Sequence, residues 1–449
     1  MIRIACVLSL ALLLAACGGG GGGGGVSSSS GSGGASNPSG GSTTTPPPVT
    51  LSNFTTLTVD AGPAALDTGP NAYTQDDVAY VSVTICAPGS TTNCQTIDHV
   101  EVDTGSVGLR IFGSVINSSL LGALPNETDT SSNPVGECYA YVDGYVFGSV
   151  RQADFTVGGE KVASMPFQVM ADGGAFANAP TSCSSGGGTN LNTVQAFGAN
   201  GIIGIGTTAT DCGGSCEING QSGAAIYYDC PTSGCASIIA RNAATTAPFQ
   251  QLPNPVAAMS TDNNGTLISL PAPASTGQAS LTGTIYFGIG TQTNNGLGSA
   301  QVLTVTTSAS NLGPGILTAT YNGKTLDNSF LDTGSNAYYF VDSSITLCTA
   351  SGFSGFYCPA APLSLSPSLQ GLNNVTASGA FTLYNAQTVL AGTNTAAPGL
   401  GVNSSQLGSG FATYPNSFDF GLPFFFGRNV YTAIEGRTAG AYTGPFVAF

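Results

Sequence analysis

The chain has 449 residues, and its 23 acidic against 8 basic residues give a formal net charge of −15. A single histidine excludes a multi-histidine zinc site, and so few basic residues argue against nucleic acid or an anionic membrane surface as a partner. With only 7% charged residues and many Thr, Val, Ser and Tyr between frequent turn residues, the composition predicts an all-β protein outside the cytoplasm.

The first segment, residues 1–16, has the features of a secretion signal, with a basic residue before a short apolar run. Its end, Leu-Ala-Ala at 14–16 before Cys17, resembles the lipobox of bacterial lipoproteins, which implies a lipid on that cysteine. Residues 17–52 are rich in Gly, Ser, Thr and Pro and predict a flexible tether. We expect a lipid anchor in the bacterial cell envelope, at the outer membrane because Gly18 is not the Asp typical of inner-membrane retention, facing the periplasm or the surface.

Ten further cysteines, an even number, favour disulfides in an oxidising compartment. The spacing suggests two local pairs, Cys86–Cys94 and Cys348–Cys358, and one longer closure, Cys138–Cys183. For the remaining four, sequential and nested pairing both stay open, and their spacing favours disulfides over a zinc site: Cys212, Cys216, Cys230 and Cys235.

From residue 53 onward, short runs of alternating apolar residues predict strands, and no long segment has a helical period. Residues 78–85 and 95–102 are two such runs, and the cysteines at the ends of their loop predict a disulfide-linked hairpin. His99 in the second run shares strand parity with Asp103, and we expect it to pack in the sheet rather than to act in catalysis. Further strands are predicted at 145–157, 281–287, 316–321 and 326–331.

An internal repeat is the most informative feature of the chain. The segment Asp103-Thr104-Gly105-Ser106 follows one strand and Asp332-Thr333-Gly334-Ser335 follows another. Each is followed downstream by an apolar segment closed by glycine, which ends at Gly204 in the first case and at Gly421 in the second. The same order of parts predicts two β lobes related by a pseudo-dyad: residues 53–294 with the first Asp, and residues 295–449 with the second.

The aspartates of the two repeated segments could act together as an acid and a base. If Asp103 and Asp332 meet on the dyad, like-charge repulsion leaves one proton on the pair over a broad acidic range. One carboxylate can then take a proton from water while the other protonates a carbonyl oxygen, which hydrolyses an amide. The neighbouring Thr, Gly and Ser would hold the carboxyl groups in position: Thr104, Gly105, Ser106, Thr333, Gly334 and Ser335. A third copy at Asp67 has no strand before it and is predicted to be an ordinary turn.

These motifs and their order resemble the pepsin-like aspartic proteases over nearly the whole folded part of the chain. On that match, residues 141–148 are similar to the flap hairpin of the family, with Tyr141 as the flap tyrosine and Gly144 near the flap tip. The resemblance implies a bilobed fold with a central cleft and a monomeric aspartic endopeptidase with an acidic pH optimum. It also implies an extended polypeptide as substrate and no metal or organic cofactor.

Several residues depart from the family pattern. Val107 and Asn336 stand where a hydroxyl commonly follows each repeated segment, and Asp419 interrupts the second apolar pair. Arg110 replaces a frequent tryptophan, and a cation there is expected to lower the pKa values of the catalytic carboxyl groups. These departures leave open the alternative of a non-catalytic binding lipoprotein with the same fold. A structural surface protein on a disulfide-rich β scaffold is a third alternative, which explains the tether and the cysteines but not the repeat.

Overall fold

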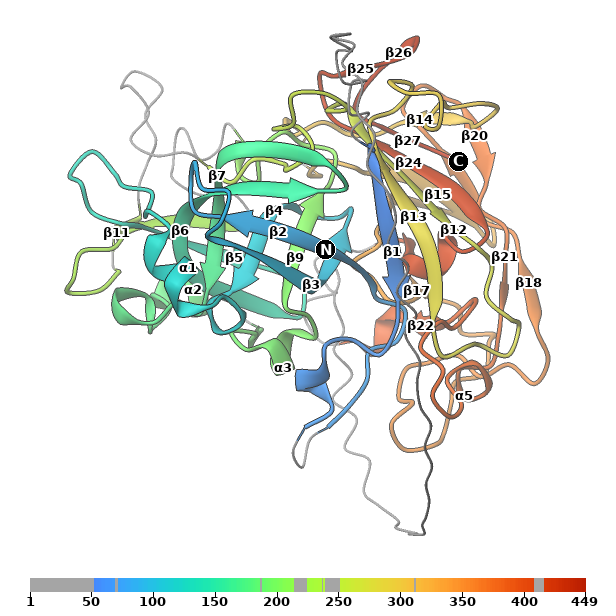
Figure 1. Cartoon of the computed structure of the whole chain (residues 1–449). Helices are drawn as coiled ribbons and strands as arrows, with labels where there is room; N and C mark the ends of the chain where they lie inside the picture. The colour runs from blue at the N-terminus through green and yellow to red at the C-terminus, as the bar shows by residue number, and fades with distance from the viewer. Residues whose placement is uncertain are drawn as a thin grey trace, which may run out of the picture.

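The computed structural model describes residues 52–68, 72–185, 188–213, 224–235, 237–238, 251–310, 312–407 and 416–449 (Figure 1). Within these ranges the chain forms many β-strands joined by turns, together with a few short helices. The predicted all-β class is therefore confirmed.

The strands lie in the following order along the chain. Those of the first half are β1 (Phe54–Val59), β2 (Ala79–Cys86), β3 (Cys94–Asp103), β4 (Val107–Phe112), β5 (Val135–Ala140), β6 (Gly144–Val157), β7 (Glu160–Met170), β8 (Thr189–Asn190), β9 (Gly201–Ile205), β10 (Ala225–Asp229), β11 (Ser237–Ile238), β12 (Gly265–Leu270) and β13 (Leu281–Phe287). Those of the second half are β14 (Val302–Thr304), β15 (Leu317–Tyr321), β16 (Lys324–Leu331), β17 (Tyr338–Phe340), β18 (Leu363–Leu365), β19 (Ser368–Gln370), β20 (Thr376–Ser378), β21 (Phe381–Leu383), β22 (Gly401–Asn403), β23 (Asp419–Phe420), β24 (Arg428–Ala433), β25 (Thr438–Ala439), β26 (Tyr442–Thr443) and β27 (Phe446–Ala448).

The helical segments are all short. They are the α-helices α1 (Ser118–Ala123), α2 (Thr181–Ser184), α3 (Val194–Phe197) and α5 (Ala386–Val389), and the 3-10 turns η1 (Ala64–Leu66), η2 (Gly113–Val115), η3 (Gly174–Phe176), η4 (Ser404–Gln406) and η6 (Leu422–Phe424). The predicted strands at 145–157, 281–287, 316–321 and 326–331 correspond to β6, β13, β15 and β16. As predicted, Asp67 lies in an exposed turn, at the end of η1.

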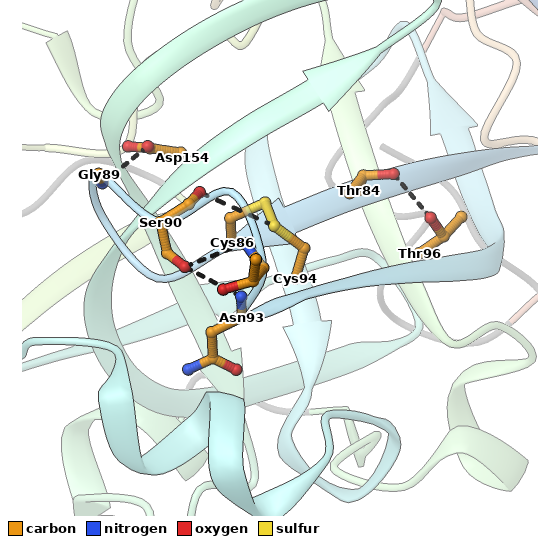
Figure 2. Close-up of a disulfide and its surroundings, with 9 residues drawn as sticks. Thr84, Cys86, Gly89, Ser90, Asn93, Cys94, Thr96 and Asp154 are labelled. Atoms are coloured by element: carbon orange, nitrogen blue, oxygen red, sulfur yellow. Dashed lines mark hydrogen bonds between the residues drawn. A yellow bond between two sulfur atoms is a disulfide. The ribbon is translucent and has the colours of Figure 1, made fainter.

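The hairpin of β2 and β3 forms as the sequence predicts, and a disulfide links its ends, where Cys86 pairs with Cys94 (Figure 2). The hydroxyl groups of Thr84 and Thr96 hydrogen-bond across the hairpin at 2.8 Å. The loop is also tied to β6, because the backbone N–H of Gly89 donates to Asp154 at 2.9 Å. These ties fix the hairpin whose second strand ends at Asp103.

His99 interrupts the regular alternation of β3. Its φ of 47° lies in the left-handed region, next to a register shift between β2 and β3. The alternation of side chains therefore breaks at this residue, and the parity with Asp103 does not extend through it. The imidazole is partly exposed and lies 3.4 Å from Asp60 and 3.0 Å from Asp98. It packs against the Tyr80 ring, in agreement with the predicted packing role.

The same strand arrangement occurs twice. In the first half β9 lies between β3, to which it is parallel, and β4, to which it is antiparallel. In the second half β23 lies between β16, to which it is parallel, and β17, to which it is antiparallel. Outer neighbours match as well, since the order β7-β4-β9-β3-β2 is repeated as β22-β17-β23-β16-β15. The sequence repeat thus corresponds to a repeat of topology.

Burial explains why the central strands of each arrangement carry almost no polar side chains. Every residue of β4 and β9 is buried, as is every residue of β17 and β22. Strands covered on both faces need apolar side chains on both faces, so their sequences are continuous apolar or glycine runs rather than alternating ones. The exceptions are Arg110 on β4, Asn403 on β22 and Asp419 on β23, all of them buried.

The sheet of the first arrangement continues from β2 through β1 into strands from both halves of the chain. The order β1-β13-β12-β24-β27-β14 combines three strands of the first half with three of the second. In Figure 1 the blue strand β1 runs beside the yellow strands β12 and β13 and the red strand β24, between the remaining strands of the two halves. This sheet holds the two repeated arrangements in one molecule.

Four disulfides link described cysteines. The three predicted pairs Cys86–Cys94, Cys138–Cys183 and Cys348–Cys358 are confirmed. In the group left open, Cys230 pairs with Cys235, its sequential neighbour, and Cys212 is also disulfide-bonded. Cys216, the predicted lipidation site Cys17 and the predicted signal and tether fall outside the described residues, apart from residue 52.

Candidate active site

The two repeated aspartates end corresponding strands. Asp103 is the last residue of β3, and Asp332 directly follows β16. A tight turn after each one leads into β4 or β17, and the backbone N–H of its second residue bonds the carboxyl group. Gly105 N donates to Asp103 Oδ1 at 2.7 Å, and Gly334 N donates to Asp332 Oδ1 at 2.9 Å. Both carboxyl groups are buried, with 2% and 1% of the residue exposed.

The structure brings the two carboxyl groups face to face. A Cβ atom at Gly105 would lie only 2.6 Å from Asp332 Oδ1, and one at Gly334 only 2.7 Å from Asp103 Oδ1. Each turn therefore needs glycine, because the carboxyl group of the opposite turn occupies the space of a side chain. Residues 229 positions apart in the chain thus form one pair, as the repeat predicts.

Two threonines lock the turns together with reciprocal hydrogen bonds. Thr104 N donates to Thr333 Oγ1 at 3.1 Å, and Thr333 N donates to Thr104 Oγ1 at 3.0 Å. The Thr333 hydroxyl also donates to the carbonyl of Val102 at 2.7 Å. Both threonines are buried, so these bonds are shielded from water and fix the relative position of the two aspartates.

The serines of the repeat support the outer carboxyl oxygens. Ser106 Oγ donates to Asp103 Oδ2, and Ser335 Oγ donates to Asp332 Oδ2 at 3.1 Å. The first turn adds a bond from Ser106 N to Asp103 Oδ1 at 3.2 Å. All six residues predicted to support the aspartates thus lie in contact with the pair or with its partner turn.

Burial and the neighbouring Asp103 raise the pKa of Asp332 to about 7. Two carboxyl groups in hydrogen-bonding contact cannot both ionise easily in a buried site, so the pair retains one proton well above pH 4. The expected lowering of the pKa by Arg110 is therefore wrong for Asp332. The reason is that the guanidinium charge is already neutralised by other partners.

Those partners form a buried network that sequence reasoning did not predict. Arg110 donates to Glu137 at 2.6 and 3.2 Å and to Asp211 at 3.1 Å. A further bond goes to the carbonyl of Val107 at 2.9 Å, and the guanidinium lies 3.7 Å from the centre of the Tyr139 ring. Glu137 and Asp211 are far from Arg110 in the chain, and no local spacing signals their meeting.

The predicted flap segment forms the end of the β5–β6 hairpin. Tyr141 N donates to the carbonyl of Gly144 at 2.7 Å and closes the turn. Val142 at the tip packs against an apolar cluster of the second half that includes Phe330 and Tyr339. The hairpin therefore extends from the first half to the cluster beside Asp332.

Within the hairpin, the Tyr141 ring is buried against the rings of Tyr139 and Phe197, with centroid distances of 5.0 and 5.8 Å. Strand β8 pairs with the start of β6, so that a Cβ atom at Gly144 would lie 2.2 Å from the carbonyl of Thr189. On the other side β10 pairs with β5, and the disulfide Cys138–Cys183 ties β5 to α2. The hairpin is thus braced along both edges near its tip.

No group of three or more His, Cys, Asp or Glu side chains with the arrangement of a metal site occurs among the described residues. None of the helices in the same ranges combines the length and apolar character needed to cross a membrane.

Comparison with known proteins places the chain in a family. No curated protein matches the chain in sequence. Residues 49–449 match the model of the family described as "Protein of unknown function (DUF3443)", and because this match covers most of the chain, the protein belongs to that family.

Proposed function

We propose that the protein is an aspartic endopeptidase in which Asp103 and Asp332 activate a water molecule. The observation that carries the proposal is the mutual approach of the two carboxyl groups, each packed against the glycine of the opposite turn. A structural scaffold has no need for two acids at this spacing, because burying them side by side costs free energy. Catalysis by a shared proton is the chemistry that such a pair provides.

We also propose that the fold is the bilobed pepsin-like fold that the sequence resembles. The repeated order of five strands supports this interpretation, since each copy ends one strand at an aspartate. The reciprocal bonds between Thr104 and Thr333 support it further, because they relate the two turns by an approximate two-fold axis.

The proposed reaction follows from the protonation of the pair. A water between the carboxyl groups loses a proton to the ionised one while its oxygen attacks the peptide carbonyl carbon. The protonated carboxyl group donates to the carbonyl oxygen. The C–N bond of the tetrahedral intermediate then breaks as the amide nitrogen takes the proton that the first carboxylate received from water, while a diol hydroxyl returns a proton to the other carboxylate. An extended peptide can pair its backbone with the β5–β6 hairpin, which places the scissile bond over the aspartates.

The location that the N-terminal sequence implies remains part of the proposal. A lipid on Cys17 would hold the enzyme at a membrane of the cell envelope, and residues 18–52 would separate the folded part from that membrane. Labelling with a radioactive or alkyne-bearing fatty acid tests this directly. Labelling of the parent chain and its loss in Cys17→Ala are expected.

The experiment for the catalytic proposal measures cleavage of an unfolded protein between pH 3 and pH 8 by the purified chain. Asp103→Asn and Asp332→Asn serve as variants, with circular dichroism to verify folding. We expect cleavage that declines as pH rises through about 7, because Asp332 then loses the proton of the pair. Equal inactivity of three folded proteins would favour the binding lipoprotein instead.

A further inference from the structure

Asp419 is a third carboxyl residue beside the catalytic pair, and the proposed reaction does not use it. It lies on β23, where its cross-strand partners are Phe330 of β16 and Tyr339 of β17. The flanking Phe418 and Phe420 belong to the main apolar core, so the alternation of the strand directs Asp419 to the opposite face. The residue is fully buried, with 0% exposed.

The surroundings of this carboxyl group connect it to the pair. Both of its oxygens are buried without a well-formed hydrogen bond, and the hydrogen-bonding group beside them is the side chain of Ser335. Ser335 Oγ in turn donates to Asp332 Oδ2 at 3.1 Å. One hydroxyl therefore stands between Asp419 and Asp332.

The titratable groups around Asp419 come from three elements. Asp332 follows β16, Asp103 ends β3, and both are acids whose negative charge acts on Asp419. From β17 comes Tyr339, whose hydroxyl donates to Asn336 at 2.5 Å. Burial, reinforced by the nearby aspartates, raises the pKa of Asp419 well above its ordinary value. The carboxyl group therefore carries a proton in acid, and this proton can be donated to Ser335 Oγ.

In the described strands of the first half, the corresponding position holds no acid. Val102, just before Asp103, pairs with Ile203 of β9, and Leu331, just before Asp332, pairs with Phe420 of β23. The residue before each of these partners is Ile202 in β9 and Asp419 in β23, so the two occupy corresponding positions. The third carboxyl group thus occurs on the Asp332 side alone within the two repeated arrangements. An isoleucine at this place shows that packing does not require an acid there.

We propose that Asp419 stores a proton for the catalytic pair and exchanges it with Asp332 through the Ser335 hydroxyl. In the transfer the Asp419 O–H bond breaks as a new bond forms to Ser335 Oγ, and the original Ser335 O–H bond breaks as a bond forms to Asp332 Oδ2. One proton moves, and the negative charge moves from Asp332 to Asp419. Asp419 is a positioning residue in this scheme, because it acts through Ser335 and not on the substrate.

The consequence is that the pair retains its shared proton to higher pH. Asp103 and Asp332 are in direct contact, whereas Ser335 separates Asp419 from Asp332. When Asp103, Asp332 and Asp419 together lose a proton, Coulomb repulsion therefore favours placing the new negative charge on Asp419. A charge within about 4–6 Å shifts a carboxyl pKa by roughly 1–3 units. The catalytic meaning of this coupling depends on the proposed function, but the coupling itself does not.

The test is carboxyl NMR on the full chain with ¹³C-labelled aspartate, titrated from pH 3 to pH 9. In Asp419→Asn we expect the loss of one signal that titrates well above the ordinary range of an aspartate. We also expect a decrease of about 1 unit in the titration midpoint of Asp332. Asp77→Asn is the matched control, because Asp77 is equally buried and its pKa is also raised, but it lies outside the pair. In this control the midpoint of Asp332 stays at its parent value.

An Asp419 signal that titrates near pH 4, or an Asp332 midpoint that is the same in Asp419→Asn as in the parent, would overturn the proposal. If Asp419→Asn does not fold, Asp419→Ile places the residue of the first half at this position and is read in the same way. The pH dependence of kcat/KM gives the catalytic readout, with the alkaline limb of Asp419→Asn moved down by about 1 unit. A parent chain without any cleavage would refute the proposed function, while the NMR titration would still decide the coupling.

Discussion

Replacement of Arg110 by methionine is the perturbation whose effect on stability the structure defines best. The side chain is fully buried and makes hydrogen bonds to Glu137, Asp211 and the carbonyl of Val107. Methionine fills a similar volume but leaves two buried acids without their cation. The variant therefore isolates the value of the charge rather than that of the packing.

The magnitude follows from the loss of one partner in a buried ion pair, which costs about 3–5 kcal/mol. A chain with roughly 400 folded residues has an unfolding entropy near 0.8 kcal/mol/K at its midpoint. A loss of about 4 kcal/mol thus corresponds to a decrease in Tm of about 5 °C. Differential scanning calorimetry at pH 7 resolves such a change.

Two further variants make the result specific. Lys161→Met removes the same charge from an exposed position and should change Tm by less than about 1 °C. Combining Arg110→Met with Glu137→Gln and Asp211→Asn removes the uncompensated charges and should recover most of the loss. A Tm of Arg110→Met within 1 °C of the parent would refute the assignment of a buried ion network.

Three other predictions concern the pair, the pH dependence of stability and the disulfides. Gly334→Ala places a Cβ 2.7 Å from Asp103 Oδ1 and should reduce kcat/KM by about 100-fold or more in a folded protein. Gly296 has open space around it, so Gly296→Ala should keep the parent activity. Equal rates for the two variants would contradict the close approach of the two turns. Burial raises the pKa of Asp77, so its ionisation destabilises the folded state. The stability that is present below pH 4 is therefore lost as pH rises. Asp77→Asn should make the decrease in Tm between pH 4 and pH 8 smaller. From loop length, removing Cys138–Cys183, with a separation of 45 residues, should cost about 4 kcal/mol in unfolding experiments, against about 2–3 kcal/mol for Cys86–Cys94, with a separation of 8; the reverse order would contradict the loop-entropy argument.

Local pattern predicted the strands and turns of the site well. The β2–β3 hairpin followed from two alternating runs with a cysteine at each inner end, and the meeting of Asp103 with Asp332 followed from the repeat. In both cases the signal is carried by residues close together in the chain or by two copies of one motif. Features of these two kinds can be recognised in the sequence without knowing which residues are neighbours in three dimensions.

Contacts between distant residues of unlike sequence could not be predicted in this way. Arg110 was expected to act on the aspartates, but Glu137 and Asp211 neutralise it from strands and loops that no spacing relates to β4. The role of Asp419 was also missed, since the sequence showed only an interrupted apolar pair. Its position beside Ser335 depends on β23 entering the sheet between β16 and β17, which is a property of the topology.

The most direct test of the central claim is a crystal structure of the chain with a peptide analogue that carries a hydroxyl group at the scissile position. We predict that this hydroxyl lies within about 3 Å of carboxyl oxygens of both Asp103 and Asp332. The peptide backbone should run beneath the hairpin tip at residues 141–144, with Asp103→Asn and Asp332→Asn each weakening its binding. A peptide bound away from the two aspartates, or a hydroxyl that contacts neither, would contradict the account.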